Sequence, residues 1–184
     1  MDPVYPSETD ELKRRLGGLP VKARVAFALA CAERLTRYSR HPVGSETYES
    51  ARAARRLARQ FIGGAAIDPG ELDALAQRLE SSPDIDDDDV AASAFVLECL
   101  RAGDVHSAVW AAERAFDARA RAAEKGMVFT VYTPEIEAAL LSDPELQGEL
   151  ARQRADLGAL ELDPHSAAEI AGHEDDRAGR PDNG

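Results

Sequence analysis

The fold is decided by an apolar stretch near the start of the chain that no charged residue interrupts, Val25-Ala26-Phe27-Ala28-Leu29-Ala30-Cys31-Ala32. Residues 21–35 around this stretch carry apolar side chains at helical spacing, which predicts an α-helix. Because apolar positions cover most of the helix circumference, we expect this helix to be buried on most sides. A central helix of this kind must be surrounded by other elements.

The surrounding elements are predicted to be helices too. Residues 90–100 are apolar apart from Ser93 and Glu98, which predicts a second central helix that packs against the first. Further helices begin at capping residues, several of them followed by proline: Ser7, Ser45, Asp68, Asp104, Thr133 and Asp143. The sequence therefore predicts an all-α fold, a compact bundle of about seven or eight helices.

The predicted domain organisation is simple. Residues 1–7 form an N-terminal lead, residues 8–162 the helical domain, and residues 163–184 a disordered acidic tail. The tail is assigned because it contains a single large aliphatic residue, Ile170, and so cannot bury enough apolar surface to offset the entropy of ordering. Residues 127–132 are interpreted as an extended connector.

Charge is distributed unevenly along the 184 residues. The net charge of −12 disfavours nucleic acid or an anionic membrane as the main partner. Residues 11–60 carry twelve basic and four acidic residues, a net charge of +8, whereas residues 61–184 carry ten basic and twenty-seven acidic ones, a net charge of −17. Two interpretations stay open: the basic helices pack beside acidic ones, or one lobe presents a binding face.

Two charged clusters are candidate partner-binding sites. Arg52, Arg55, Arg56 and Arg59 follow the spacing i, i+3, i+4, i+7, which places four guanidinium groups on one helical stripe. Such a stripe repels itself, so it is either neutralised inside the fold or bound by an anionic partner. The second cluster, Asp86, Asp87, Asp88 and Asp89, precedes the helix over residues 90–100, where the helix dipole stabilises acidic side chains.

No catalytic, cofactor-binding or metal-binding residue is assigned from the sequence. The acidic run does not match a calcium-binding EF-hand loop, because its sixth position is Asp89 rather than glycine. Cys31 and Cys99 lie in apolar stretches, which is typical of small buried side chains in a reducing compartment. The chain has no apolar run long enough to span a membrane and no secretory signal at its start, so we expect a cytoplasmic protein.

Two stretches resemble a known bacterial family. The first is Ala26-Phe27-Ala28-Leu29-Ala30-Cys31-Ala32-Glu33-Arg34-Leu35, and the second is Asp143-Pro144-Glu145-Leu146-Gln147-Gly148-Glu149-Leu150 with Arg152 and Gln153. Together they resemble the YjaG-like proteins, domain-of-unknown-function family 416. The resemblance covers residues 12–160 and implies a compact all-helical bacterial domain, without any activity, cofactor or catalytic residue.

Two functions remain open at the sequence level. The first is a non-enzymatic interaction protein that binds a protein partner, and its most concrete form is immunity to a basic toxin, because small acidic helical proteins include toxin-immunity proteins. The second is a small-ligand protein or enzyme with a polar site between helices, built from Glu33, Arg34, His106 and Glu113. Only the positions of these side chains in space can decide between the two.

Overall fold

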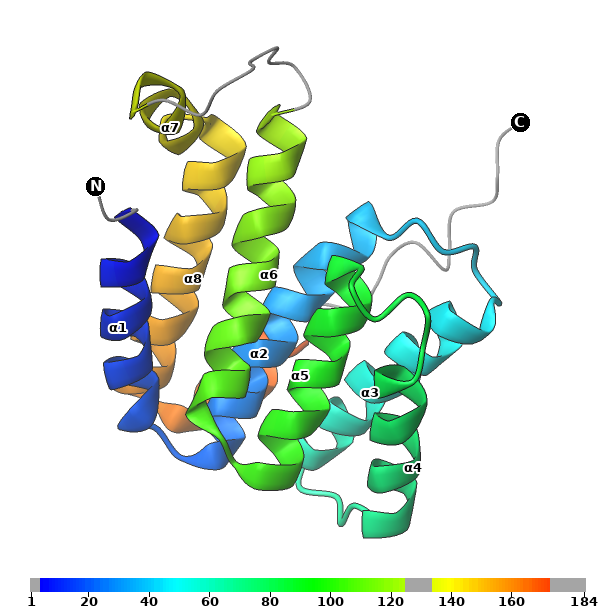
Figure 1. Ribbon diagram of the computed structural model, residues 1–184. Coiled ribbons are helices and arrows are strands. Elements are labelled where there is room, and N and C mark those ends of the chain that lie inside the picture. The colour runs from blue at the N-terminus through cyan, green and yellow to red at the C-terminus, as the bar shows by residue number, and fades with distance from the viewer. Residues whose placement is uncertain (1–3, 125–133, 173–184) are drawn as a thin grey trace.

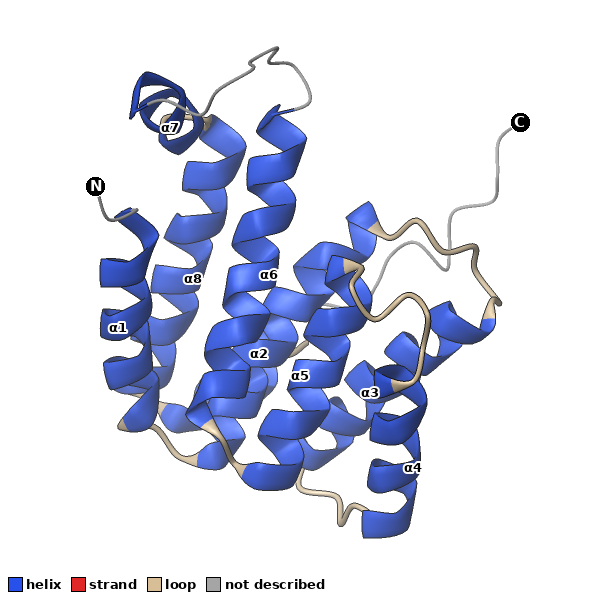
Figure 2. Cartoon of the chain, in the orientation of Figure 1, coloured by secondary structure: helices blue, strands red, loops and turns tan. Residues whose placement is uncertain are grey.

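A computed structural model describes residues 4–124 and 134–172, and α-helices account for most of them (Figures 1 and 2). No strand occurs in these two ranges, which confirms the predicted all-α fold. The nine α-helices described are α1 (Val4–Gly17), α2 (Val21–Leu35), α3 (Glu46–Ile62), α4 (Pro69–Glu80), α5 (Asp88–Ala102), α6 (Val105–Glu124), α7 (Pro134–Leu141), α8 (Pro144–Leu162) and α9 (Ala167–Ile170). Two short 3-10 helices, η1 (Thr36–Tyr38) and η2 (Pro164–Ser166), extend the ends of α2 and α8.

Helix α2 lies at the centre of the bundle, as its apolar stretch predicts. Every residue from Val25 to Ala32 is buried, and α2 contacts α3, α5, α6, α8 and α9. In Figure 1, α5 and α6 lie across α2 and partly cover it. Four of these eight buried residues are alanines, whose small size lets neighbouring helices pack closely.

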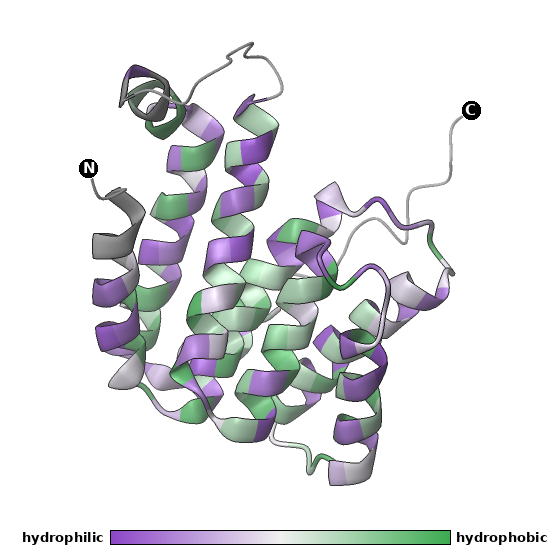
Figure 3. Ribbon diagram, in the orientation of Figure 1, coloured by the Kyte–Doolittle hydropathy of each residue, from purple (hydrophilic) through white to green (hydrophobic). Residues whose placement is uncertain are grey.

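Helix α5 contributes to two hydrophobic clusters. Ala92, Val96 and Cys99 belong to the main core around α2 and α6, whereas Val90 and Leu97 belong to a second core with α3 and α4. Since α5 is packed on both sides, its sequence is apolar nearly all round. Figure 3 shows the hydrophobic residues concentrated where the helices face one another.

Four of the predicted capping residues begin helices in the structure. Ser7 instead lies inside α1, which begins at Val4 and so includes part of the predicted lead at residues 1–7, and Thr133 lies outside the described residues. The Ser45 hydroxyl accepts a hydrogen bond from the Tyr48 amide of α3, and the Asp68 carboxylate accepts one from Gly70 of α4. Asp104 accepts hydrogen bonds from the amides of His106 and Ser107, and Asp143 accepts them from the first turn of α8. These bonds satisfy amides that have no partner within the helix, so the helix starts can be predicted from short polar signals.

The C-terminal boundary differs from the sequence prediction. Helix α9 lies in the range assigned to the disordered tail, yet Ala167 and Ala171 are buried in the main core, and α9 contacts α2 and α3. The helical domain therefore extends at least to residue 172, because two small side chains are buried in the core and Ile170 packs against it. Two predicted segments lie outside the described residues. They are the rest of the predicted tail, residues 173–184, and the predicted connector, residues 127–132.

None of the helices in residues 4–124 and 134–172 has the length and apolarity needed to cross a lipid bilayer.

Candidate functional site

An open hollow of about 600 Å³ lies between the end of η1 with the loop that follows it, the start of α5 and the last turns of α6. Its walls contain the whole of the predicted acidic run together with three further charged residues and three uncharged ones: Asp86, Asp87, Asp88, Asp89, Glu124, Arg40, Arg121, Tyr38, Ala118 and Ala122. Five acidic residues therefore face two arginines. We call this feature the acidic hollow.

The four aspartates differ in their surroundings. Asp88 forms ion pairs with Arg121 and Arg114 of α6, so it joins the start of α5 to α6. Asp87 lies with one carboxylate oxygen 3.1 Å from Nε2 of His41, and Asp89 is buried. Asp86 is exposed. Asp86 is thus the member of the run most open to a partner.

Asp117 on α6 lies near Asp88 but does not line the hollow. Burial raises the pKa of the Asp117 carboxyl, and the nearby charge of Asp88 raises it further, although Arg121 and Arg114 act in the opposite direction. The raised pKa of Asp117 is therefore due mainly to burial, and the two arginines oppose the effect of the Asp88 charge.

The predicted arginine stripe divides between the interior and the surface. Arg55 is buried and donates a 3.0 Å hydrogen bond to the Ser93 hydroxyl, and both Arg55 and Arg59 form ion pairs with Glu33 of α2. Residues spaced i, i+3, i+4, i+7 span about 100° of a helix, and here that arc crosses the edge of the buried face. The positive charge is therefore neutralised in part by Glu33 inside the fold, and not by the acidic run.

Arg52 and Arg56 remain exposed. Together with Arg78 of α4 they line a shallow depression of about 290 Å³. The other charged residues that line this depression are Glu46 and Glu49. One Arg52 nitrogen lies 3.8 Å from Glu49, which is a surface ion pair. Exposed pairs of this kind contribute little to stability, about 0–1 kcal/mol.

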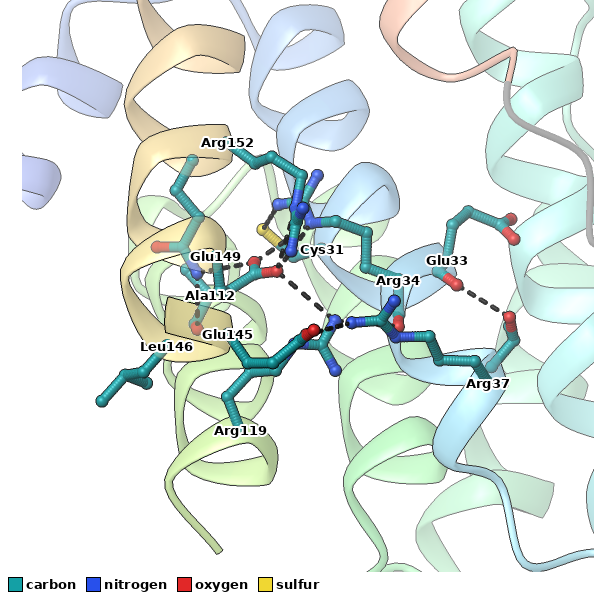
Figure 4. A network of polar contacts seen from close by, with 12 residues as sticks. Cys31, Glu33, Arg34, Arg37, Ala112, Arg119, Glu145, Leu146, Glu149 and Arg152 are labelled. Carbon is teal, nitrogen blue, oxygen red and sulfur yellow. Dashed lines mark hydrogen bonds and ion pairs between the residues drawn. The ribbon is translucent and has the colours of Figure 1, made fainter. Parts of the chain in front are cut away.

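A buried ionic network joins α2, α6 and α8 (Figure 4). Glu149 is fully buried and accepts hydrogen bonds from Arg34 at 3.0 Å and from the Gln153 side-chain amide at 3.0 Å. Arg34 also donates to Asp156 at 2.7 Å, and the buried guanidinium of Arg119 lies 3.7 Å from Glu149 and against the Tyr38 ring. The network holds three helices together at the core.

Three residues of this network lie in the two stretches that carry the family resemblance. Arg34 belongs to the first resembling stretch, and Glu149 and Gln153 belong to the second. Their spacing along the chain does not show that they meet, since more than 100 residues separate Arg34 from Glu149. The two stretches meet because α2 and α8 pack side by side.

The four residues of the predicted polar site do not form one site. Glu33 faces α3, Arg34 faces α8, Glu113 accepts a 3.4 Å hydrogen bond from Thr9, and His106 is exposed beside Asp104. Burial raises the pKa of the Glu113 carboxyl. None of the other three residues of the predicted site contacts Glu113. The structure therefore does not bring these four candidate residues together at one ligand site.

Both cysteines are free and buried, as predicted. Burial raises the pKa of the Cys99 thiol to about 12 and that of Cys31 still further. A thiol with a raised pKa is protonated at neutral pH and is a poor nucleophile. The two side chains act as small core residues.

One solved structure resembles this chain in fold, at low sequence identity. Neither the models of known protein families nor curated proteins match it. The crystal structure of a DUF416 family protein from Shewanella baltica matches it with a TM-score of 0.66, over 87% of this chain and 89% of that one, at 16% sequence identity. The chain has the DUF416 fold. The two stretches that resemble the family, on α2 and α8, thus lie in a DUF416 fold, which confirms the implied all-helical architecture.

Proposed function

We propose that this protein is a DUF416 family member that acts without catalysis, by binding a basic protein partner through the acidic hollow. One observation carries the proposal: four consecutive aspartates and Glu124 line an open hollow whose basic wall residues are Arg40 and Arg121. Arg121 is already paired with Asp88, so it offsets little of the remaining charge.

The size and charge of the hollow indicate what it binds. A volume of about 600 Å³ accommodates one or two lysine or arginine side chains, and the long-range field of an acidic surface accelerates encounter with a basic protein. The expected partner is therefore a protein that projects cationic side chains. A basic toxin that this chain neutralises in the cytoplasm is the most concrete partner of that kind.

The proposal is tested with a defined cationic probe. A capped tetra-arginine peptide is added to the isotope-labelled protein at near-physiological salt, and backbone chemical shifts are followed by NMR. We expect the shift changes to cluster at residues 38–40, 86–89 and 118–124, which line the hollow. The double variant Asp86→Asn and Glu124→Gln should weaken binding, because it removes two charges of the hollow.

A matched variant separates the hollow from general attraction. Glu71→Gln with Glu80→Gln removes the same charge from two exposed residues of α4. We expect this variant to bind the peptide like the unmodified protein. Equal weakening in the two double variants, or shift changes spread over the whole acidic surface, would contradict the proposal.

A further inference from the structure

Beside the acidic hollow, three potential metal ligands from two different loops lie close together. His41 follows η1, and Asp84 and Asp87 lie in the turn before α5. His41 Nε2 is 3.1 Å from an Asp87 oxygen, and His41 Nδ1 is 3.9 Å from an Asp84 oxygen. One ligand atom from each of the three residues lies within 4.8 Å of the other two.

The surrounding structure holds the two carboxylates in place. The Asp87 amide donates a 2.9 Å hydrogen bond to the Asp84 carbonyl, so a tight turn brings the two side chains together. The Thr47 hydroxyl of α3 donates a 2.8 Å hydrogen bond to Asp84. Asp87 occupies the N-cap position of α5, yet its side chain makes no capping hydrogen bond and lies toward His41 instead.

The contact between His41 and Asp87 is not an ordinary hydrogen bond. Nε2 of His41 is shielded from solvent and has no hydrogen-bond partner among the described residues, although the Asp87 oxygen is only 3.1 Å away. The distance suits a hydrogen bond but the direction does not. A metal ion about 2.0–2.2 Å from both a nitrogen and an oxygen holds them roughly 3 Å apart without such alignment.

We propose that His41, Asp84 and Asp87 bind a first-row divalent transition-metal ion such as Zn²⁺. One imidazole with two carboxylates is a ligand set for these ions, whereas Ca²⁺ and Mg²⁺ prefer oxygen ligands alone. The site is only partly buried, so water completes the coordination or a bound partner supplies a ligand. The ion would join the loop after η1 to the loop before α5.

This inference goes beyond the binding of a basic partner and stands independently of it. The competing interpretation is a protonated His41 that pairs with the two aspartates and binds no metal. Asp87 lies on both features, whereas Asp86 and Glu124 line only the hollow, so variants of different residues test the two proposals.

Zn²⁺ binding to the full-length, untagged, chelator-treated protein tests the site. We expect one Zn²⁺ ion per chain by calorimetry, and a shift of the His41 ring-nitrogen signals in NMR spectra. His41→Ala, Asp84→Asn and Asp87→Asn should each weaken binding about tenfold or more, since removal of a supporting residue alone typically costs 10–100-fold. Asn at position 84 can still accept the hydrogen bond from Thr47, so this variant preserves the local fold.

The chain contains a matched control for the histidine. His106 Nδ1 also lies 3.1 Å from an aspartate, Asp104, but no second carboxylate in the described part of the chain joins that pair. His106→Ala should therefore bind Zn²⁺ like the unmodified protein. Equal affinity in all the variants, a Zn²⁺-induced shift at His106 rather than His41, or no binding at millimolar Zn²⁺ would each overturn the proposal.

Discussion

At the scale of single residues, the stability of this protein depends on how buried charges are paired. Glu149 has no solvent contact, and its charge is balanced by Arg34, with Gln153 completing its hydrogen bonds. Arg119 is nearly as buried and relies on the same carboxylate and on the Tyr38 ring. Removing one partner from such a network leaves charges without compensation in a medium of low dielectric constant.

We predict that Glu149→Leu lowers the free energy of unfolding by about 3–5 kcal/mol, because Arg34 and Arg119 lose their buried counter-charge. Urea denaturation measures this loss. Glu145→Leu is the control on the same helix, since Glu145 is exposed and its ion pair with Arg37 contributes about 0–1 kcal/mol. Similar small losses in both variants would contradict the role assigned to the network.

At the scale of elements, the approach of α2 to α5 depends on one glycine. Gly103 ends α5 in the left-handed conformation, with φ of 65°, and its amide bonds to the Cys99 carbonyl. A Cβ atom at this position would lie 3.0 Å from a methyl carbon of Val21 at the start of α2. Glycine is therefore required both by the backbone angle and by the close contact.

Gly103→Ala should accordingly destabilise the protein more than Gly64→Ala. Gly64 also has a positive φ, of 90°, but a Cβ atom there would meet nothing within 4 Å. Both variants bear the backbone strain of about 1–2 kcal/mol, and Gly103→Ala adds about 1 kcal/mol for the contact with Val21. Chemical denaturation of the two variants gives the difference directly. Equal losses would show that α2 and α5 have room to separate.

At the scale of the whole molecule, the C-terminal segment completes the core around α2. Ala167 and Ala171 are buried there, and Ile170 packs against the same cluster. Residues 173–184 contain no large aliphatic side chain. The two parts of the predicted tail should therefore behave differently when they are removed.

We predict that deletion of residues 173–184 leaves the melting temperature nearly unchanged. Deletion of residues 163–184 should lower it by about 3–6 °C, because the loss of α9 exposes apolar surface whose burial contributes about 1–2 kcal/mol. Thermal unfolding followed by circular dichroism compares the two deletions with the full chain. If both deletions leave the transition in place, α9 contributes nothing to the stability of the domain.

The sequence alone determined most of the helices and the identity of the central ones, although it did not reveal α9. Helical periodicity and capping residues are local signals, and the start of α4 at Asp68 and of α8 at Asp143 were both predicted from them. The burial of α2 followed from composition, since eight consecutive apolar residues can be accommodated only in a core. The clustering of Asp86 to Asp89 was equally visible, because these residues are adjacent in the chain.

Only the tertiary structure decided which charges meet. Arg55 and Arg59 turn toward Glu33, while Arg52 and Arg56 stay exposed, because the packing of α3 on α2 sets where the buried face ends. The meeting of His41 with Asp84 and Asp87, and of Arg34 with Glu149, likewise joins loops and helices far apart in the chain. Local propensities do not specify which residues far apart in the chain come together. The packing of one helix on another specifies these contacts, and that packing depends on the whole core.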